Sequence, residues 1–378
     1  MHEEPKGGWS APSDDAGEPR DHDRAPEGSV QTTAGVMESS SETPARPGTK
    51  VKSAAPVLVL GCDRSGTKLL YHMLLSSGGF AIYYSESNAF NLLGLRFGNL
   101  KRRRNRQRLM EVWLQSKLFY RSGLSREEVE PRVLADCRNA GDFLRVLMEA
   151  IARKQGKQRW AEATPQHLHY LPLIKKLIPD ALVIHIIRDG RDVALSLDKA
   201  GWIRPFPWGR ERSLLAAGLY WKWMVTKGLK FGRAMGADYL EVHYEDLVRQ
   251  PRETLARVGA FIGHDLDYDR IQRVGLGSVS DPNSSFKSDD RHKELNPVGR
   301  WAKLLPPERV ALLEQAIGPL LRELDYDLAT PAGASTAGLS VRIMKALYPA
   351  LLESKLWLKS STPLRRFARL GRMAIGER

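Results

Sequence analysis

The sequence has little cysteine and no long apolar run. Its 378 residues include only two cysteines, Cys62 and Cys137, too few for a disulfide framework or a cysteine-built zinc cluster. No stretch of about 18 residues is apolar throughout, so we expect no transmembrane helix. The N-terminal segment lacks an apolar core, which predicts that there is no signal peptide. These absences favour a cytoplasmic protein, or one that is peripheral to the inner face of a membrane.

Charge is unevenly distributed along the chain. The formal net charge is +14, although residues 1–50 carry ten acidic and only five basic side chains. Residues 335–378 carry nine basic and two acidic side chains. The basic excess of the remaining chain suits anionic ligands such as nucleotides, phosphates or sulfates, but it also suits solubility alone.

Composition divides the chain into three parts. Residues 1–53 are rich in Gly, Pro, Ser and acidic residues and poor in large apolar ones, which predicts a disordered N-terminal tail. Residues 54–330 carry the apolar patterns of a folded domain. Residues 331–378 begin as a Pro/Ala/Gly/Ser linker and continue as a basic, partly amphipathic C-terminal tail.

Short β-rich runs alternate with longer helical patterns in the folded part. Runs at 57–60, 182–187 and 239–243 predict strands. The patterns that predict helices cover 67–77, 107–121, 140–154, 190–199, 212–234, 250–262 and 306–326. This alternation predicts an α/β fold with a doubly wound parallel sheet flanked by helices. Ligands bind beyond the carboxyl ends of the strands in such sheets.

The most informative segment follows the first predicted strand. The loop Gly61–Gly66 leads to a helix that starts near Thr67, and the free N–H groups of such a helix start bind anions. The two glycines have the spacing of the nucleoside-triphosphate P-loop, G-x-x-x-x-G-K-[ST]. However, Thr67 occupies the lysine position, and Lys68 comes one residue late. We therefore expect an anion site that departs from this P-loop, and a P-loop kinase or other phosphotransferase is the alternative.

A second candidate anion site follows the strand at 182–187. Arg188 leaves the end of this strand, and Ser196 lies eight residues further on, in the next predicted helix. A guanidinium and a hydroxyl supply charge-assisted and neutral donors for a phosphate. Two such sites at one edge of the sheet would suit a nucleotide with phosphates on both its 5′ and 3′ oxygens.

Five short segments occur in a fixed order along the chain. Each is weak evidence for a protein family when taken alone, but the five in this order are specific evidence. They are Arg64-Ser-Gly-Thr67, Trp160–His167, Arg188–Ser196, Tyr244–Val248 and Val298–Trp301. Across residues 55–328 this set resembles the sulfotransferases that use 3′-phosphoadenosine 5′-phosphosulfate (PAPS). The resemblance implies a P-loop-like sulfotransferase domain over 54–330. It also implies transfer of a sulfuryl group from PAPS to a hydroxyl or amine, which gives 3′-phosphoadenosine 5′-phosphate (PAP) and a sulfated product.

The resemblance also implies roles for individual residues. The residues implied to bind the 5′-phosphosulfate are Arg64, Ser65, Gly66, Thr67 and Lys68. Those implied to bind the 3′-phosphate are Arg188 and Ser196, with Arg300 a further candidate for this phosphate or for the adenine-side loop. Cations and backbone N–H groups would neutralise the transferring group, so no metal ion is required.

Three residues are candidates for the general base that removes the proton from the acceptor. We expect Glu86, which follows the first predicted helix at an expected second strand end, where relatives with a glutamate base place their carboxylate. His167 and His169 are rivals, because other relatives use histidine. Ala163 stands where many relatives carry a lysine, which in some of them helps to stabilise the transferring group. That role is then absent here or is supplied by Arg64, Lys68 or another cation.

The sequence does not identify the acceptor, and we expect a small molecule, a glycan or a lipid. Residues 101–108 carry six cations in eight positions, and we expect them to face either an anionic partner or solvent. The aromatic side chains of residues 202–208 could line an acceptor pocket. The tail 339–378 suits an anionic membrane surface, which would favour a lipid or glycolipid acceptor, or else packs on the domain. No nucleic-acid-binding signature is found. The oligomeric state is also open.

Overall fold

The computed structural model describes residues 52–203, 213–280, 297–331 and 338–362. The predicted tail 1–53 lies almost wholly outside the described residues. The same holds for most of the linker after residue 331 and for the end of the basic tail. The division of the chain into three parts therefore stays a prediction.

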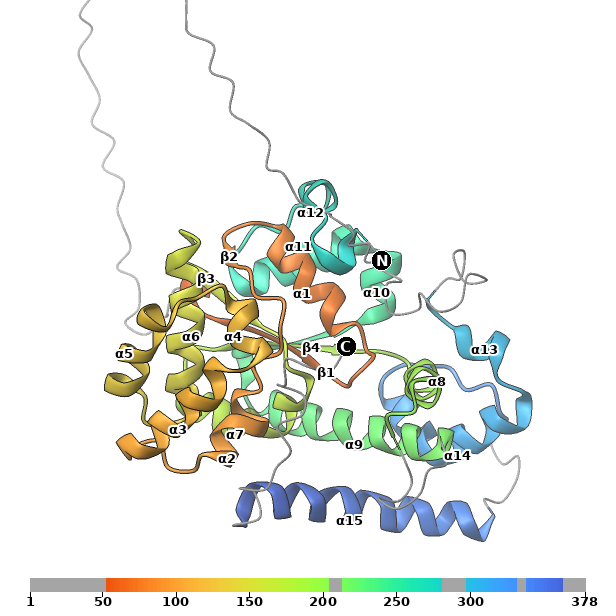
Figure 1. The fold of residues 1–378 in the computed structure, drawn as a ribbon. Coiled ribbons are helices and arrows are strands. Elements are labelled where there is room, and N and C mark those ends of the chain that lie inside the picture. Colours follow the sequence, from red (N-terminus) through yellow and green to blue (C-terminus); the bar gives the residue numbers. More distant parts are fainter. Residues whose placement is uncertain (1–51, 204–212, 281–296, 332–337, 363–378) are drawn as a thin grey trace, which may run out of the picture. The chain divides into compact units, whose positions relative to one another are not determined.

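A five-stranded parallel sheet forms the framework, with the strand order β2-β3-β1-β4-β5 (Figure 1). The three predicted strands are present as β1 (Val57–Gly61), β4 (Leu182–Ile187) and β5 (Tyr239–His243). The sequence did not predict β2 (Phe80–Ala81) and β3 (Arg159–Glu162). Two residues are too few to form a pattern, and β3 begins and ends with a charged residue, so neither shows the apolar run of a buried strand.

Helices connect and cover the strands. The predicted helix 107–121 is divided in two, because Ser116 starts a second helix by accepting a hydrogen bond from the Phe119 N–H (3.4 Å). None of the helices among the described residues is long and apolar enough to cross a membrane. The α-helices are α1 (Thr67–Ser76), α2 (Gly94–Arg96), α3 (Arg103–Leu114), α4 (Lys117–Ser122), α5 (Arg126–Asp136), α6 (Ala140–Lys154), α7 (Leu171–Leu177), α8 (Gly190–Ala200), α9 (Leu214–Arg233), α10 (Tyr244–Arg249), α11 (Pro251–Ile262), α12 (Tyr268–Val274), α13 (Arg300–Leu304), α14 (Pro307–Glu323) and α15 (Leu339–Ser361).

The side chains of β1 point alternately into two apolar layers, one on each face of the sheet. Val57 and Val59 belong to the cluster that α1 and α11 complete. Leu58 and Leu60 belong to the cluster that α6 and α9 complete. In Figure 1, α1 and α11 lie on one side of β1 and β4, and α9 lies on the other. Burial on both faces is typical of a doubly wound α/β sheet, so the predicted fold class is confirmed.

The path of the chain through the sheet determines where a ligand can bind. The chain runs from β1 out to β2, returns to β3, and then crosses to β4 on the other side of β1. Ligand sites of such sheets lie where the strand order reverses, beyond the carboxyl ends of the strands. The loop after Gly61 and the residue Arg188 both emerge at this place.

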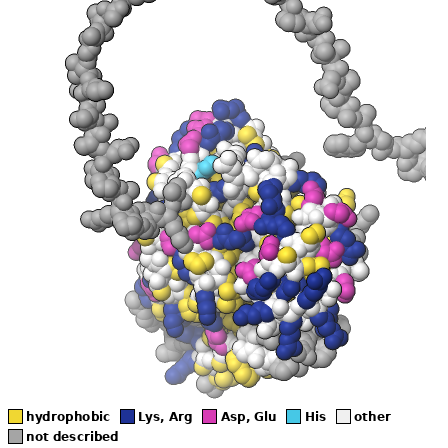
Figure 2. Space-filling model, turned by 90° about the vertical axis from the view of Figure 1, so that its left-hand side faces the viewer, with side chains coloured by type: hydrophobic (Ala, Val, Ile, Leu, Met, Phe, Trp, Pro, Cys, Tyr) yellow, Lys and Arg dark blue, Asp and Glu magenta, His cyan; other side chains and the backbone are white. Residues whose placement is uncertain are grey.

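The basic run 101–108 lies at the beginning of α3, on the face of the molecule that Figure 2 shows, where many Lys and Arg side chains are spread. Arg106 is buried and donates hydrogen bonds to the carbonyl oxygens of Leu100 (2.7 Å) and Lys101 (2.9 Å). The exposed arginines of the run include Arg102 and Arg104, which line a surface hollow on α3. At least one cation of the run therefore has a structural role.

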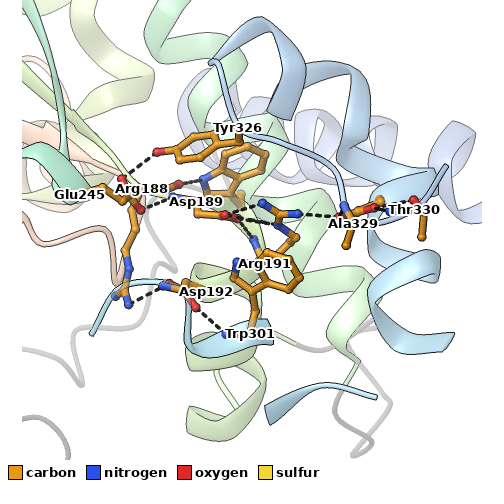
Figure 3. A network of polar contacts seen from close by, with 12 residues as sticks. Arg188, Asp189, Arg191, Asp192, Glu245, Trp301, Tyr326, Ala329 and Thr330 are labelled. Atoms are coloured by element: carbon orange, nitrogen blue, oxygen red, sulfur yellow. Dashed lines mark hydrogen bonds and ion pairs between the residues drawn. The ribbon is translucent and has the colours of Figure 1, made fainter. Parts of the chain in front are cut away.

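A buried ion-pair network fixes α14 to α8 (Figure 3). Arg191 Nη1 lies 2.5 Å from Glu314 Oε1, and its Nη2 lies 2.7 Å from Asp189 Oδ2. Glu314 also accepts hydrogen bonds from the backbone N–H groups of Ala329 and Thr330, both at 2.9 Å. One buried carboxylate thus joins α8, α14 and the segment that follows α14.

We expect Glu314→Ala to lower the free energy of unfolding by about 3 kcal/mol or more, because it removes a buried carboxylate and leaves the buried Arg191 guanidinium without this partner. The part-buried N–H groups of Ala329 and Thr330 also lose their acceptor. Glu323→Ala is the matched control on α14. The Glu323 side chain is 53% exposed in its pair with Arg233, so its loss should cost less than about 1 kcal/mol. Urea unfolding followed by tryptophan fluorescence measures both, and equal losses would contradict the role of the network.

Candidate functional site

The loop after β1 forms a tight turn at the N-terminus of α1. Arg64 and Gly66 have φ values of 72° and 94°, in the left-handed region. A Cβ atom on Gly66 would lie 2.3 Å from Cδ2 of Tyr244, so only glycine fits there. The turn is closed by a hydrogen bond from the Ser65 N–H to the Cys62 carbonyl (3.1 Å). The free N–H groups at the start of α1 therefore face the end of the sheet, as an anion site requires.

The structure brings the first loop and the second candidate anion site into direct contact. Arg188 Nη1 donates a hydrogen bond to the carbonyl oxygen of Arg64 (3.1 Å), and Arg64 Nε donates one to Ser196 Oγ (2.9 Å). The Arg188 guanidinium also lies 4.6 Å from the ring centroid of Tyr244. The two sites therefore form one continuous surface.

Positive charge is concentrated at this surface. Burial, followed by the charge of Arg188, lowers the pKa of Arg64 and also that of Arg300. Arg300 lowers the pKa of Arg64 as well, so repulsion between neighbouring guanidinium groups disfavours the charged form of Arg64. An anion bound among them would remove this repulsion.

Asp192 holds Arg300 beside Arg188. Its carboxylate accepts hydrogen bonds from the N–H groups of Gly299 and Trp301, both at 2.9 Å, at the start of α13. Its Oδ2 atom also lies 3.6 Å from Arg188 Nη2, one turn earlier on the chain (Figure 3). Sequence reasoning missed Asp192, although its i,i+4 spacing from Arg188 was an available signal.

A cleft opens beside the loop. The side chains that line it include Arg64, Thr67, Lys68, Glu86, Arg188, Trp202 and Tyr244. Ser65 Oγ and Arg188 Nε are buried and have no hydrogen-bond partner among the described residues. Such atoms need a partner from elsewhere, which a bound anion would supply. Of the predicted aromatic segment 202–208, only Trp202 and Ile203 lie within the described residues.

Comparison with known families decides what kind of protein carries this cleft. The model of a family described as "Sulfotransferase family" matches residues 56–268, which is more than half of the chain. The chain belongs to the sulfotransferase family. The strand β1, its loop and α1 give this sulfotransferase the expected P-loop-like arrangement, and the match favours this family over the alternative of a P-loop kinase.

Solved structures similar to this sulfotransferase include other sulfotransferases. The sulfotransferase domain from the Synechococcus PCC 7002 olefin synthase is 24% identical, with 72% of this chain and 95% of that chain covered and a TM-score of 0.49. The sulfotransferase domain from the curacin biosynthetic pathway is 18% identical, with coverages of 72% and 98% and a TM-score of 0.47. A mouse sulfotransferase complexed with PAP is 14% identical, with coverages of 77% and 88% and a TM-score of 0.39.

A second cavity, of about 230 Å³, adjoins the cleft of the sulfotransferase. Lys68 and Glu86 line both spaces, so they lie where the two meet. The other side chains that line the second cavity include Tyr71, His72, Tyr84, Lys117, Arg121 and Ala163. Burial, followed by the charge of Lys68, lowers the pKa of His72 to about 4, so this ring is neutral at pH 7. Sequence reasoning did not find Lys117 or Arg121, because nothing in the sequence brings α4 to this cavity.

Glu86 lies in the loop after β2. The strand ends at Ala81, earlier than the strand end that we expected at Glu86, because only two residues pair with β3. Asn88 fixes the loop with a hydrogen bond from its Nδ2 to the Glu86 carbonyl (3.0 Å). The side chain of Glu86 still reaches both cavities.

His167 lies beneath this loop and is fully buried. Its Nε2 accepts a hydrogen bond from the Phe90 N–H (3.2 Å), so its Nδ1 carries the proton and donates it to Glu162 Oε2 (3.1 Å). Glu162 Oε1 in turn accepts from the N–H (3.2 Å) and Oγ (2.7 Å) of Ser87 and from Thr164 Oγ1. The predicted segment Trp160–His167 thus supports the loop that carries Glu86.

His169, the other histidine candidate, packs against α9. Its ring centroid lies 4.0 Å from that of Trp223. Burial, followed by the charge of Lys227, lowers the pKa of His169 to about 3. It does not line either of the two cavities that contain Glu86.

The buried carboxylate of Glu162 makes stability depend on pH. Burial alone would raise its pKa, but His167, Thr164 and Ser87 outweigh burial and lower the pKa to about 2. The stabilisation is present above the unfolded pKa of about 4 and is lost as the pH falls through 2. We expect the gap in unfolding free energy between the wild type and Glu162→Gln to shrink by about 3 kcal/mol from pH 5 to pH 2.

Urea unfolding at several pH values measures this gap. Glu323→Gln on the surface of α14 is the control, and its gap to the wild type should change much less, because its pair with Arg233 is exposed to solvent. A constant gap for Glu162→Gln would show that the hydrogen bonds of Glu162 do not favour its ionised form.

Proposed function

We propose that this sulfotransferase moves a sulfuryl group from PAPS to a hydroxyl or amine of a small-molecule, glycan or lipid acceptor, with PAP as the second product. The observation that carries the proposal is the convergence of Arg64, Arg188 and Arg300 beside the N-terminus of α1. Two phosphate-type groups on one nucleotide would neutralise this charge and satisfy the buried donor atoms of Ser65 and Arg188.

The donor site has two parts in this proposal. The residues that hold the 5′-phosphosulfate are Arg64, Ser65, Gly66, Thr67 and Lys68. The residues that hold the 3′-phosphate are Arg188, Ser196 and Arg300. The hydrogen bond from Arg64 to Ser196 joins the two parts, so a single ligand can engage both.

Glu86 is the general base in this proposal. It removes the proton from the acceptor as the acceptor oxygen or nitrogen bonds to sulfur and the bond from sulfur to the 5′-phosphate oxygen breaks. Glu86 is preferred to His167 because Glu86 lines both cavities, whereas both ring nitrogens of His167 are engaged in buried hydrogen bonds.

Lys68 compensates for Ala163 in this proposal. Both residues line the second cavity, and Lys68 also lines the donor cleft. Negative charge develops on the 5′-phosphate oxygen as the bond to sulfur breaks, and the Lys68 ammonium and the N–H groups of the loop stabilise it there. This would explain why the lysine stands one residue later than in a kinase P-loop.

The acceptor occupies the second cavity in this proposal. Tyr71 and Tyr84 supply aromatic surface, and Lys117 and Arg121 supply positive charge from α4. This mixture fits an acceptor with an apolar or aromatic body that also carries an anionic group.

Binding of PAP tests the donor site. We expect PAP at 100 times its Kd to stabilise the protein by about 2.7 kcal/mol without magnesium, seen as a raised melting temperature. Arg188→Ala should weaken PAP binding at least tenfold, because a charged hydrogen-bond donor is lost. Arg252→Ala, on an exposed pair with Asp269, should leave PAP binding unchanged. Stabilisation by Mg-ATP but not by PAP would overturn the assignment.

Turnover tests Glu86 and Lys68. Labelled PAPS with a cell extract, followed by mass spectrometry, identifies a sulfated product and so provides an acceptor. With this acceptor we expect Glu86→Gln to lower kcat at least a hundredfold and to keep the PAP-induced rise in melting temperature. Lys68→Ala should also lower kcat, because the leaving oxygen loses a cation.

Glu111→Gln on α3 is the control for both variants and should keep wild-type turnover. If Glu86→Gln turns over at nearly the wild-type rate, the base is another residue. If it fails to bind PAP, its loss of activity says nothing about proton transfer, and Glu86 instead belongs to the donor site.

A further inference from the structure

The helix α15 is held against the domain by its inner face. Val341 and Tyr348 are buried there, and Leu352 packs against the core cluster. Glu353 accepts hydrogen bonds from Trp223 Nε1 (2.6 Å) and Lys227 Nζ (2.8 Å), both on α9. The packing that we considered for the tail therefore occurs, and it uses only one side of the helix.

The outer face of α15 is also apolar. Five large hydrophobic side chains are exposed on it, out of eleven in all the described residues. They are Ile343 (47%), Leu347 (57%), Leu351 (47%), Trp357 (60%) and Leu358 (42%). Hydrophobic side chains are visible in Figure 2 at the lower end of the molecule, at the level of α15 in Figure 1. Single exposed apolar residues are common, but a continuous stripe marks an interaction surface.

Spacing shows that most of these residues form one stripe. Ile343, Leu347 and Leu351 are four residues apart, and Leu358 follows seven residues later, so all four lie on one side of the helix. At about 100° per residue, Trp357 lies about 40° to one side of Ile343, Arg342 lies about 60° beyond Trp357, and Lys355 lies about 40° beyond Leu351. Arg342 and Lys355 are exposed and thus lie on opposite flanks of these five apolar residues. We call these four apolar residues together with Trp357 the outer stripe.

The charge around the outer stripe identifies its partner. Glu353 is the single acidic residue of α15, and it bonds inward to α9. Basic residues flank the stripe, and the chain beyond α15 continues with Arg365, Arg366 and Arg369. An apolar stripe between cations suits an anionic lipid surface, where the apolar side chains enter the headgroup boundary and the cations meet the headgroups. A second copy of the chain would bring cations against cations.

We propose that the outer stripe of α15 binds the surface of an anionic lipid bilayer while the inner face stays packed on α9. The helix then lies in the plane of the membrane, with Trp357 at the headgroup level, where tryptophan is enriched. This proposal does not depend on the transfer reaction and can fail or succeed without it.

Vesicle co-sedimentation of the full chain tests the proposal. We expect the wild type to bind vesicles of phosphatidylcholine with phosphatidylserine, and to bind pure phosphatidylcholine vesicles much more weakly. The double variant Leu347→Ser, Leu351→Ser should lose at least tenfold in binding, because two apolar side chains no longer enter the lipid. The double variant Arg342→Gln, Lys355→Gln should lose at least fivefold and become less sensitive to salt.

The matched control is the double variant Leu173→Ser, Val274→Ser, which changes two exposed hydrophobic residues outside α15 and should bind as the wild type does. Circular dichroism and melting temperature check that each variant is folded. Unchanged binding of the Leu347, Leu351 variant overturns the proposal, and so does equal binding to both kinds of vesicle. A third outcome also overturns the proposal: the wild type does not bind vesicles but forms dimers, and the Leu347, Leu351 variant is monomeric. That result would assign the outer stripe to self-association.

Discussion

Three arginine side chains share one end of the sheet, and the rest of the site depends on how their repulsion is balanced. Arg188 is central, because after burial its charge is the largest cause that lowers the pKa of both Arg64 and Arg300. Backbone carbonyl oxygens, the ring of Tyr244 and the Asp192 carboxylate surround its guanidinium and partly offset this charge. The remaining positive charge is what an anionic ligand would neutralise at this place.

The segment from Arg188 to Asp192 lines the cleft and also connects several helices. Arg188 faces the cleft, Asp189 begins α8 by accepting a hydrogen bond from the Arg191 N–H, and Arg191 binds α14 through Glu314. Asp192 then holds the start of α13 and with it Arg300. One turn of chain therefore positions the site and also fastens the C-terminal helices to the sheet.

The sequence predicted the parts of the fold that carry a strong pattern. β1, β4 and β5 were found because each is a run of mostly apolar or β-branched residues, while β2 and β3 were missed because they are short or bounded by charge. The loop after β1 and Arg188 were predicted from their places after strands, and Arg300 only through a family resemblance. Lys117 and Arg121 were missed, because only contacts between distant segments bring them to the cavity. Asp192 was missed although its spacing from Arg188 is local, because its bonds to the start of α13 cannot be read from the sequence.

The two cavities that meet at Glu86 are supported by different kinds of structure. The cleft beside the loop after β1 rests on buried strands and on ion pairs that reach α14. The neighbouring cavity takes its cations Lys117 and Arg121 from α4, a helix of six residues near the surface. Substitutions on α4 can therefore reshape this cavity while the cleft stays intact. A change in this cavity would then alter which molecules fit beside Glu86 without disturbing the loop after β1 or Arg188.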